Sequence, residues 1–160
     1  MVLTPTRELA DQVYTNVKHY SKFLDLRAAV IFGGVNQKPQ VSHIKNGVDI
    51  LVATPGRLLD LHKQDYINLD YIETFVLDEA DLMLDMGFIP QVKRIVRATP
   101  RKEDRQTLLF SATFTQDILN LAQQWTFDPV TVEIEPERVA TAMVDQRVYL
   151  VTSHERLKVL

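Results

Sequence analysis

Cysteine is absent from this 160-residue chain, so disulfide bonds and cysteine-ligated zinc are excluded. The four histidines do not follow the spacing of metal ligands. No apolar run approaches the ~20 residues of a membrane span, and the first residues lack the basic start and long apolar stretch of a signal peptide. We therefore expect a cytoplasmic protein without a membrane segment.

Glycine is also scarce, and its placement excludes one common phosphate-binding loop. None of the five glycines is followed by lysine, so the pattern G-x-x-x-x-G-K-[ST] does not occur in the 160 residues. In many nucleotide-binding proteins the backbone of that loop surrounds the phosphates. Any phosphate contact made by this chain must therefore use other residues.

The composition is otherwise that of a globular domain, with 46% hydrophobic and 24% charged residues. A domain of this size buries roughly 70% of the surface that its unfolded chain exposes. The net charge of −3 argues weakly against a nucleic-acid partner, but the charge is uneven. Residues 1–64 hold eight Lys/Arg and five Asp/Glu, whereas residues 65–160 hold ten and sixteen. The charge is therefore compatible with a polyanionic partner at the first part of the chain.

Short apolar runs alternate with amphipathic helical stretches along the chain. The runs that we expect to be strands are 1–3, 27–32, 49–53, 74–78, 107–110 and 130–134. The expected helices are 5–20, 39–45, 55–63, 82–96 with a break at residues 86–87, and 116–124. This alternation predicts an α/β fold with a mostly parallel sheet and helices on both faces. In such sheets, ligands bind beyond the carboxyl ends of the strands.

The pattern changes after residue 134. Residues 135–146 show no clear period and are predicted to be a linker. Residues 147–151 have the pattern of a new strand, followed by the start of a helix. We therefore expect residues 1–134 to form one domain and residues 147–160 to begin a second one.

Two similar motifs, TPTR (4–7) and TPGR (54–57), each follow an apolar run. Thr4 or Thr6, and likewise Thr54, can cap a helix, and the prolines suit the first helical position. The free N–H groups of a helix start, together with the helix dipole, attract anions. Arg7 and Arg57 add a guanidinium fork that matches phosphate oxygens. Helix capping alone also explains Thr-Pro in each copy.

Two adjacent carboxylates, Asp78 and Glu79, lie at the end of the apolar strand predicted at 74–78. In a phosphate-transferring site, one carboxylate holds Mg²⁺ and its neighbour orients or deprotonates the attacking water. Alternatively, acidic residues simply favour the start of the next helix. Asp78, Asp81 and Asp85 also share one face if they lie on a single helix, which would make a metal site, but the preceding strand disfavours that arrangement.

Ser111 and Thr113 follow the next apolar strand and offer two hydroxyl groups beside the acidic cluster if the two strands are neighbours. Taken alone, they are equally an ordinary helix cap. Gly33 and Gly34 follow the strand at 27–32. They allow close backbone approach to a ligand, or form only a turn.

The conjunction of the motifs is more specific than any one of them. The motifs are, in order, PTRELA (5–10), GG (33–34), TPGR (54–57), DEAD (78–81) and SAT (111–113). In this order they resemble those of the DEAD-box RNA helicases, and LDMGF (84–88) and LLFSATF (108–114) resemble the bacterial branch.

The resemblance implies a RecA-like fold of the P-loop NTPase type that lacks the P-loop strand, with ATP and Mg²⁺ as cofactors. Asp78 would hold Mg²⁺ through water, and Glu79 would act as base for the attacking water. Asp81 would belong to the nucleotide site and, with Ser111 and Thr113, couple it to RNA binding. The implied contacts to the RNA backbone are Pro5, Thr6, Arg7, Gly33, Gly34, Thr54, Gly56 and Arg57.

The implied activity is ATP-dependent unwinding of short RNA duplexes or remodelling of RNA–protein complexes. RNA is the implied partner, with ribosomal or RNA-degradation assemblies as further partners. In the family, the phosphate loop precedes PTRELA and the arginine-bearing motifs lie in a second domain. We therefore expect an interior fragment of a helicase, inactive by itself. The alternative is a shortened RNA-binding or interaction module that does not hydrolyse ATP.

Overall fold

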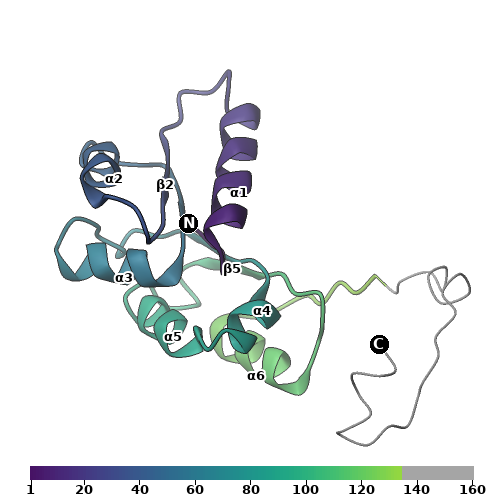
Figure 1. The fold of residues 1–160 in the computed structure, drawn as a ribbon. Helices are drawn as coiled ribbons and strands as arrows, with labels where there is room; N and C mark the ends of the chain where they lie inside the picture. The colour runs from purple at the N-terminus through teal and green to yellow at the C-terminus, as the bar shows by residue number, and fades with distance from the viewer. Residues whose placement is uncertain (135–160) are drawn as a thin grey trace, which may run out of the picture. The chain divides into compact units, whose positions relative to one another are not determined.

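The computed structural model describes residues 1–134, in which parallel strands alternate with helices (Figure 1). The predicted linker at 135–146 and the predicted second domain at 147–160 lie outside the described residues. The strands are β1 (Val2–Leu3), β2 (Ala28–Ile31), β3 (Ile50–Ala53), β4 (Thr74–Leu77) and β5 (Gln106–Leu109). The helices are α1 (Arg7–Tyr20), α2 (Gln37–Ile44), α3 (Pro55–Lys63), α4 (Ala80–Asp85), α5 (Ile89–Arg97) and α6 (Gln116–Trp125).

The five strands form one sheet in the order β2-β3-β1-β4-β5, and every neighbouring pair is parallel. β1 has only two residues but lies at the centre, where Leu3 is in register with Ala53 of β3 and Leu77 of β4. Leu3 is fully buried there. The predicted α/β fold with a mostly parallel sheet is therefore confirmed, and the sheet is entirely parallel.

The direction of the chain across the sheet assigns the helices to its two faces. The connection from β1 to β2 runs towards one edge, whereas the connections from β2 to β3, β3 to β4 and β4 to β5 all run towards the other. Because parallel crossovers are right-handed, α1 covers one face, and α2, α3 and α5 cover the opposite face. α1 packs on β2 and β3, while α3 packs against α5 (Figure 1).

The core lies between the sheet and these helices. Phe75 of β4 is the largest fully buried side chain, and α5 adds Ile89, Val92 and Ile95 at a helical spacing of three. Fully burying one such side chain stabilises the fold by about 1.5–3 kcal/mol. Apolar residues of β1 to β4 and of this helix therefore supply much of the core.

The predicted break at residues 86–87 separates α4 from α5. Gly87 has φ +71°, a left-handed conformation that suits glycine, and its N–H donates to Leu84 O at 3.0 Å. Pro90 lies in the first turn of α5, where a missing N–H costs nothing. The chain therefore ends one helix and restarts another at this point.

The strand predicted at 130–134 is not formed. Its apolar residues are exposed, with Val130 at 88% and Ile134 at 87% of their accessible surface. Alternation of apolar and polar residues makes a strand only when a neighbouring strand bonds its N–H and C=O groups. No such neighbour pairs with 130–134 among the described residues. No helix in this described part is long and apolar enough to cross a membrane.

We expect the isolated chain to melt over a broad, concentration-dependent range. β5 bonds to β4 on one side, and no strand among the described residues pairs with its other side. Such an edge exposes N–H and C=O groups that pair with another chain. Circular dichroism melts and sedimentation velocity at two protein concentrations would measure this.

Gln106→Lys provides the matched variant, because Gln106 is exposed on β5 and a lysine on an edge strand opposes pairing. The variant should associate less than the wild-type chain. A sharp, cooperative melt of a wild-type monomer would contradict the expectation.

Candidate functional site

The five polar motifs lie side by side at the carboxyl edge of the sheet. Each follows a different strand, and the strand order places them as GG, TPGR, TPTR, DEAD and SAT across the edge. Their order along the chain is different, because β1 is inserted between β3 and β4. The three motifs predicted to contact RNA are therefore neighbours, and the two predicted for the nucleotide and its coupling follow next.

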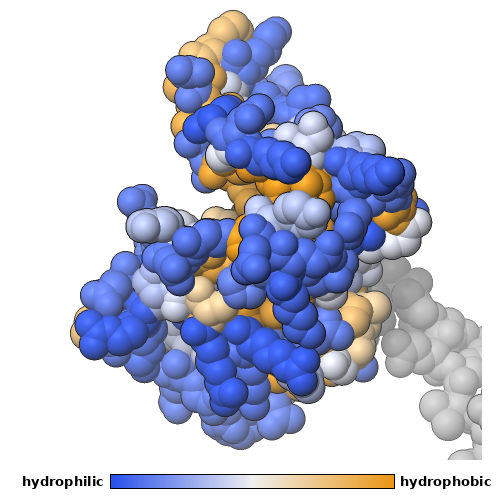
Figure 2. Space-filling view, turned by 90° about the vertical axis from the view of Figure 1, so that its left-hand side faces the viewer, coloured by the Kyte–Doolittle hydropathy of each residue, from blue (hydrophilic) through white to orange (hydrophobic). Residues whose placement is uncertain are grey.

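The GG, TPGR and TPTR motifs surround one open cavity of about 590 Å³, which we call the edge cavity. All eight residues predicted to contact RNA line it. The remaining lining residues are Glu8, Pro55, Asp60, Met86, Phe88 and Gln91. The molecular face over α2 and α3 is mostly hydrophilic, with apolar side chains visible mainly in its recesses (Figure 2).

In the TPTR motif, Thr6 is the cap of α1 and its Oγ1 accepts a hydrogen bond from Leu9 N at 3.2 Å. Pro5 therefore precedes the cap, and the prediction that it occupies the first helical position is wrong. Thr4 has another role, because its N–H donates to Ala53 O at 3.0 Å and extends the pairing of β1 with β3. Arg7 takes the first helical position.

In the TPGR motif, Thr54 is the cap of α3 and Pro55 takes the first helical position, as predicted. Thr54 makes no side-chain capping bond. The backbone N–H of Thr54 donates to Ile31 O at 3.0 Å, and this bond continues the pairing of β3 with β2. Arg57 is consequently the third helical residue. The starts of α1 and α3 both border the edge cavity, where their free N–H groups favour an anion.

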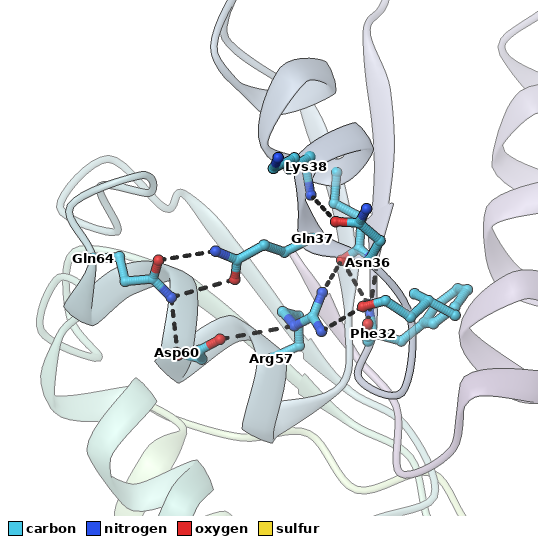
Figure 3. Close-up of polar contacts among 9 residues, drawn as sticks. Phe32, Asn36, Gln37, Lys38, Arg57, Asp60 and Gln64 are labelled. Carbon is cyan, nitrogen blue, oxygen red and sulfur yellow. Dashed lines mark hydrogen bonds and ion pairs between the residues drawn. The ribbon is translucent and has the colours of Figure 1, made fainter.

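The two arginines differ in what surrounds them. The Arg7 side chain is 53% exposed, lies 5.9 Å from the Phe32 ring centre and makes a 3.7 Å ion pair with Glu8. The Arg57 side chain is only 11% exposed. It donates to Gln40 Oε1 at 3.2 Å and to Val35 O at 2.9 Å (Figure 3).

The GG loop borders Arg7. Gly34 has φ +77°, and a Cβ added to it would lie 3.1 Å from Arg7 Nη1. The positive φ therefore favours glycine at this turn, and a larger residue would also crowd the Arg7 guanidinium. A Cβ added to Gly33 would meet nothing within 4 Å, so this position faces open space at the cavity.

At the end of β4, the backbone turns sharply at Glu79. Asp78 N donates to Leu3 O and Ala80 N donates to Phe110 O, each at 3.0 Å, so the residues on both sides of Glu79 are tied to neighbouring strand ends. Glu79 itself is left-handed, with φ 51°. Such a conformation costs of order 1–3 kcal/mol and persists where the surroundings impose it. Glu79 is exposed and makes no side-chain bond to cap α4.

Asp78 lies outside α4, because that helix begins at Ala80. Asp78, Asp81 and Asp85 therefore do not share one helical face, and this alternative is excluded. No group of three or more metal-ligating side chains gathers within the described residues. Asp78 Oδ1 accepts the N–H of Glu79 at 3.1 Å, and no bond to its Oδ2 is found among residues 1–134. One or two carboxylates are enough for Mg²⁺, which keeps several waters and binds substrate phosphates.

Asp81 is bonded to the SAT motif. Its Oδ2 accepts hydrogen bonds from Thr113 N at 3.0 Å and Thr113 Oγ1 at 3.1 Å. Ser111 Oγ donates to Thr113 O at 2.7 Å. The cap of α6 is Thr115, so the alternative that SAT is only a helix cap is excluded. The predicted neighbourhood of the acidic cluster and the two hydroxyl groups is present in the structure.

The hydrogen bonds to Asp81 also set its ionisation. Partial burial would raise the pKa of Asp81, but bonds from Leu82 N and from Thr113 hold the pKa below its ordinary value. Asp81 is therefore a carboxylate at neutral pH and accepts both bonds from Thr113.

Sequence reasoning did not predict four of the residues that line the edge cavity: Asp60, Met86, Phe88 and Gln91. Met86 and Phe88 belong to the LDMGF segment, whose resemblance gives a signal, but Asp60 and Gln91 follow no motif. Gln40 does not line the cavity, yet it is 8% exposed and bonds Arg57 and Phe32. A glutamine inside a short helix carries no local mark of such contacts.

Comparison with known proteins agrees with this geometry. The family model described as DEAD/DEAH box helicase matches residues 1–121. The ATP-dependent RNA helicase RhlB of Pseudomonas aeruginosa is 51% identical over the whole of this chain, which covers 41% of that protein. RhlB of Xanthomonas axonopodis pv. citri is 40% identical, again over the whole chain, which covers 28% of it. The chain thus spans less than half the length of these curated relatives.

Solved structures show the same fold. A hypothetical ATP-dependent RNA helicase from Sulfolobus tokodaii has a TM-score of 0.73 and 40% identity over 79% of this chain and 38% of its own. A DEAD box protein from Methanococcus jannaschii has a TM-score of 0.73 and 45% identity over 79% of this chain and 34% of its own. The fold is therefore RecA-like, as the resemblance implied. With its motifs in one row and its family model matched over residues 1–121, the chain belongs to the DEAD/DEAH box helicase family.

Proposed function

We propose that the full-length protein containing this chain is an ATP-dependent RNA helicase that separates short RNA duplexes or remodels RNA–protein complexes. The observation that carries this proposal is the row of motifs at the sheet edge. Residues from three strand ends surround one cavity, and carboxylates and hydroxyls occupy the next two strand ends. In this proposal the 160-residue chain supplies part of the machinery and does not hydrolyse ATP alone.

The edge cavity is proposed to bind the RNA backbone. Two helix starts offer N–H groups there, and Arg7 offers an exposed guanidinium. Gly33 leaves room for a backbone to approach. Phosphate contacts carry no base identity, so binding through this cavity is independent of RNA sequence.

The carboxylates after β4 are proposed to serve the nucleotide. Asp78 would hold Mg²⁺ through water, which suits its free oxygen and the small number of ligands nearby. Bound Mg²⁺ would supply charge neutralisation on the phosphates. Glu79, exposed and turned out of the helix, would orient the attacking water and accept its proton.

The bonds between Asp81 and Thr113 are proposed to connect the two functions. They join the ends of β4 and β5, and Ser111 fixes the position of Thr113. Asp78, Glu79 and Asp81 lie within four residues of one another, so a shift in the DEAD segment would move Thr113 with it. RNA is the partner in this proposal, and ATP with Mg²⁺ the cofactors.

Glu79→Gln in the full-length protein should lower RNA-stimulated ATP hydrolysis by at least about 10²-fold, because it removes the base and keeps the size of the side chain. RNA binding should persist. Glu73→Gln is the matched control, because Glu73 is exposed at the opposite end of β4. Absence of RNA-stimulated hydrolysis in the wild-type protein would overturn the proposed activity and favour a non-catalytic RNA-binding module.

Arg7→Ala should weaken binding to RNAs of different sequence by similar factors and reduce the salt slope of log K by about one. Fluorescence anisotropy across a salt series would measure both. Lys18→Ala on the same helix removes an equal charge at roughly 16 Å along the axis and should have little effect. Unequal losses across RNA sequences would argue against backbone binding.

Thr113→Val should raise the pKa of Asp81 part of the way back to the ordinary value of an aspartate, because one of the bonds that lowers the pKa is removed. The stabilisation from these bonds is present at neutral pH and is lost as pH falls through the lowered folded pKa. NMR titration of ¹³C-labelled aspartate carboxyls would follow it. Ser111→Ala, which removes a hydroxyl that does not touch Asp81, should change the pKa less. An unchanged pKa in Thr113→Val would contradict the assignment.

A further inference from the structure

Arg57 is held by protein groups on several sides. Its Nη1 donates to Gln40 Oε1 at 3.2 Å, its Nη2 donates to Val35 O at 2.9 Å, and its Nε lies 3.9 Å from Asp60 Oδ2 (Figure 3). With 11% of its side chain exposed, Arg57 has little surface left for a phosphate. Its guanidinium joins α3 to the loop after β2.

Gln40 of α2 completes this junction. β2 ends at Ile31, and the Gln40 side-chain amide forms hydrogen bonds with both the N–H and the C=O of the next residue, Phe32. Its Oε1 accepts from Phe32 N at 3.2 Å, and its Nε2 donates to Phe32 O at 3.1 Å. The same Oε1 accepts from Arg57, so only this orientation of the amide satisfies all three partners. The Gln40 side chain thus replaces a neighbouring strand and fixes the direction in which the chain leaves the sheet.

The direction of this loop determines the surroundings of Arg7. The Phe32 ring lies 5.9 Å from the Arg7 guanidinium carbon. Gly34, two residues further, has Arg7 Nη1 so close that a Cβ would lie 3.1 Å from it. A shift of the loop would therefore displace the Arg7 guanidinium or open space around it.

The different roles of the two arginines follow from their helical positions. Arg7 is the first residue of α1, whereas Arg57 is the third residue of α3. Each residue turns an α-helix by about 100°, so a first and a third helical residue are about 200° apart around the axis. If α1 and α3 are compared from their first residues, Arg7 and Arg57 therefore extend from nearly opposite sides of their helices. Arg7 reaches the exposed side of the edge cavity, and Arg57 reaches the GG loop.

We propose that Gln40 is a positioning residue for RNA binding: locked by Arg57, it holds the Phe32–Gly34 loop in the place that orients Arg7 towards the RNA backbone. This proposal rests on the proposed binding of RNA in the edge cavity. It gives Arg57 a different role from the phosphate ligand predicted from the sequence. Gln40 and Arg57 act on RNA through the loop, and Arg7 makes the phosphate contact.

The test is a double-mutant cycle in the full-length protein with Gln40→Leu, Arg7→Ala and both together, measured as RNA affinity across a salt series. Gln40→Leu should weaken binding about tenfold, a coupling within the usual range for residues that share partners. It should also lower the salt slope, although it removes no charge, because Arg7 is displaced. In the Arg7→Ala background it should have little further effect.

Gln37→Leu is the matched control, because Gln37 lies on the same helix and its side chain, in the described part of the chain, bonds to Gln64 and not to Phe32 or Arg57 (Figure 3). It should leave affinity and salt slope unchanged. If thermal melting shows that Gln40→Leu does not fold, the double-mutant cycle is repeated with Gln40→Glu in place of Gln40→Leu. That variant keeps an acceptor for Phe32 N and Arg57, but its second carboxylate oxygen cannot donate to Phe32 O and repels it, so the loop should still shift and the loss of RNA affinity should again depend on Arg7.

Equal losses from Gln40→Leu with and without Arg7 would overturn the positioning role, as would unchanged affinity in a folded variant. These results are distinct from failure of the proposed function. If Arg7→Ala itself leaves RNA binding unchanged, the edge cavity is not the RNA site. If Arg7→Ala weakens binding and the two substitutions are additive, only the role of Gln40 is lost.

Discussion

The parallel pairing of β1 with β3 on one side and β4 on the other joins the two halves of the sheet. The GG and TPGR strands lie on one side of it, and the DEAD and SAT strands lie on the other. β1 has only two residues, but backbone bonds beyond them continue the pairing, from Thr4 N to Ala53 O and from Asp78 N to Leu3 O. The spacing between the edge cavity and the carboxylates is therefore set at this central strand.

The same backbone bonds explain the unusual conformation at Glu79. A left-handed non-glycine residue is costly when isolated. Here the residues before and after Glu79 are tied to the ends of β1 and β5, so the turn between them has little freedom. Asp81 is then placed where it accepts two bonds from Thr113. Strain at one residue is thus compensated by ladder bonds and by a charged hydrogen-bond acceptor nearby.

Periodicity in the sequence was sufficient for most of the fold. Five of the six predicted strands are formed in the described residues, and the helix break at residues 86–87 followed from glycine chemistry. The strand at 130–134 failed because alternation reports only that a segment suits a sheet, and not that a partner strand is present. Pro5 was misplaced because two threonines could cap α1, and only the observed bond to Thr6 Oγ1 distinguishes them.

By itself, the sequence determined which residues are candidates for a site, because helix starts, carboxylates and hydroxyls are local features that follow apolar strands. The tertiary structure decided which of them are neighbours and what each arginine can reach. TPTR and TPGR differ by the identity of one cap, and this shifts Arg57 by two helical positions relative to Arg7. Gln40 contacts Arg57 from 17 residues away along the chain. Such contacts depend on the crossing of α2, α3 and the sheet, and no local pattern encodes them.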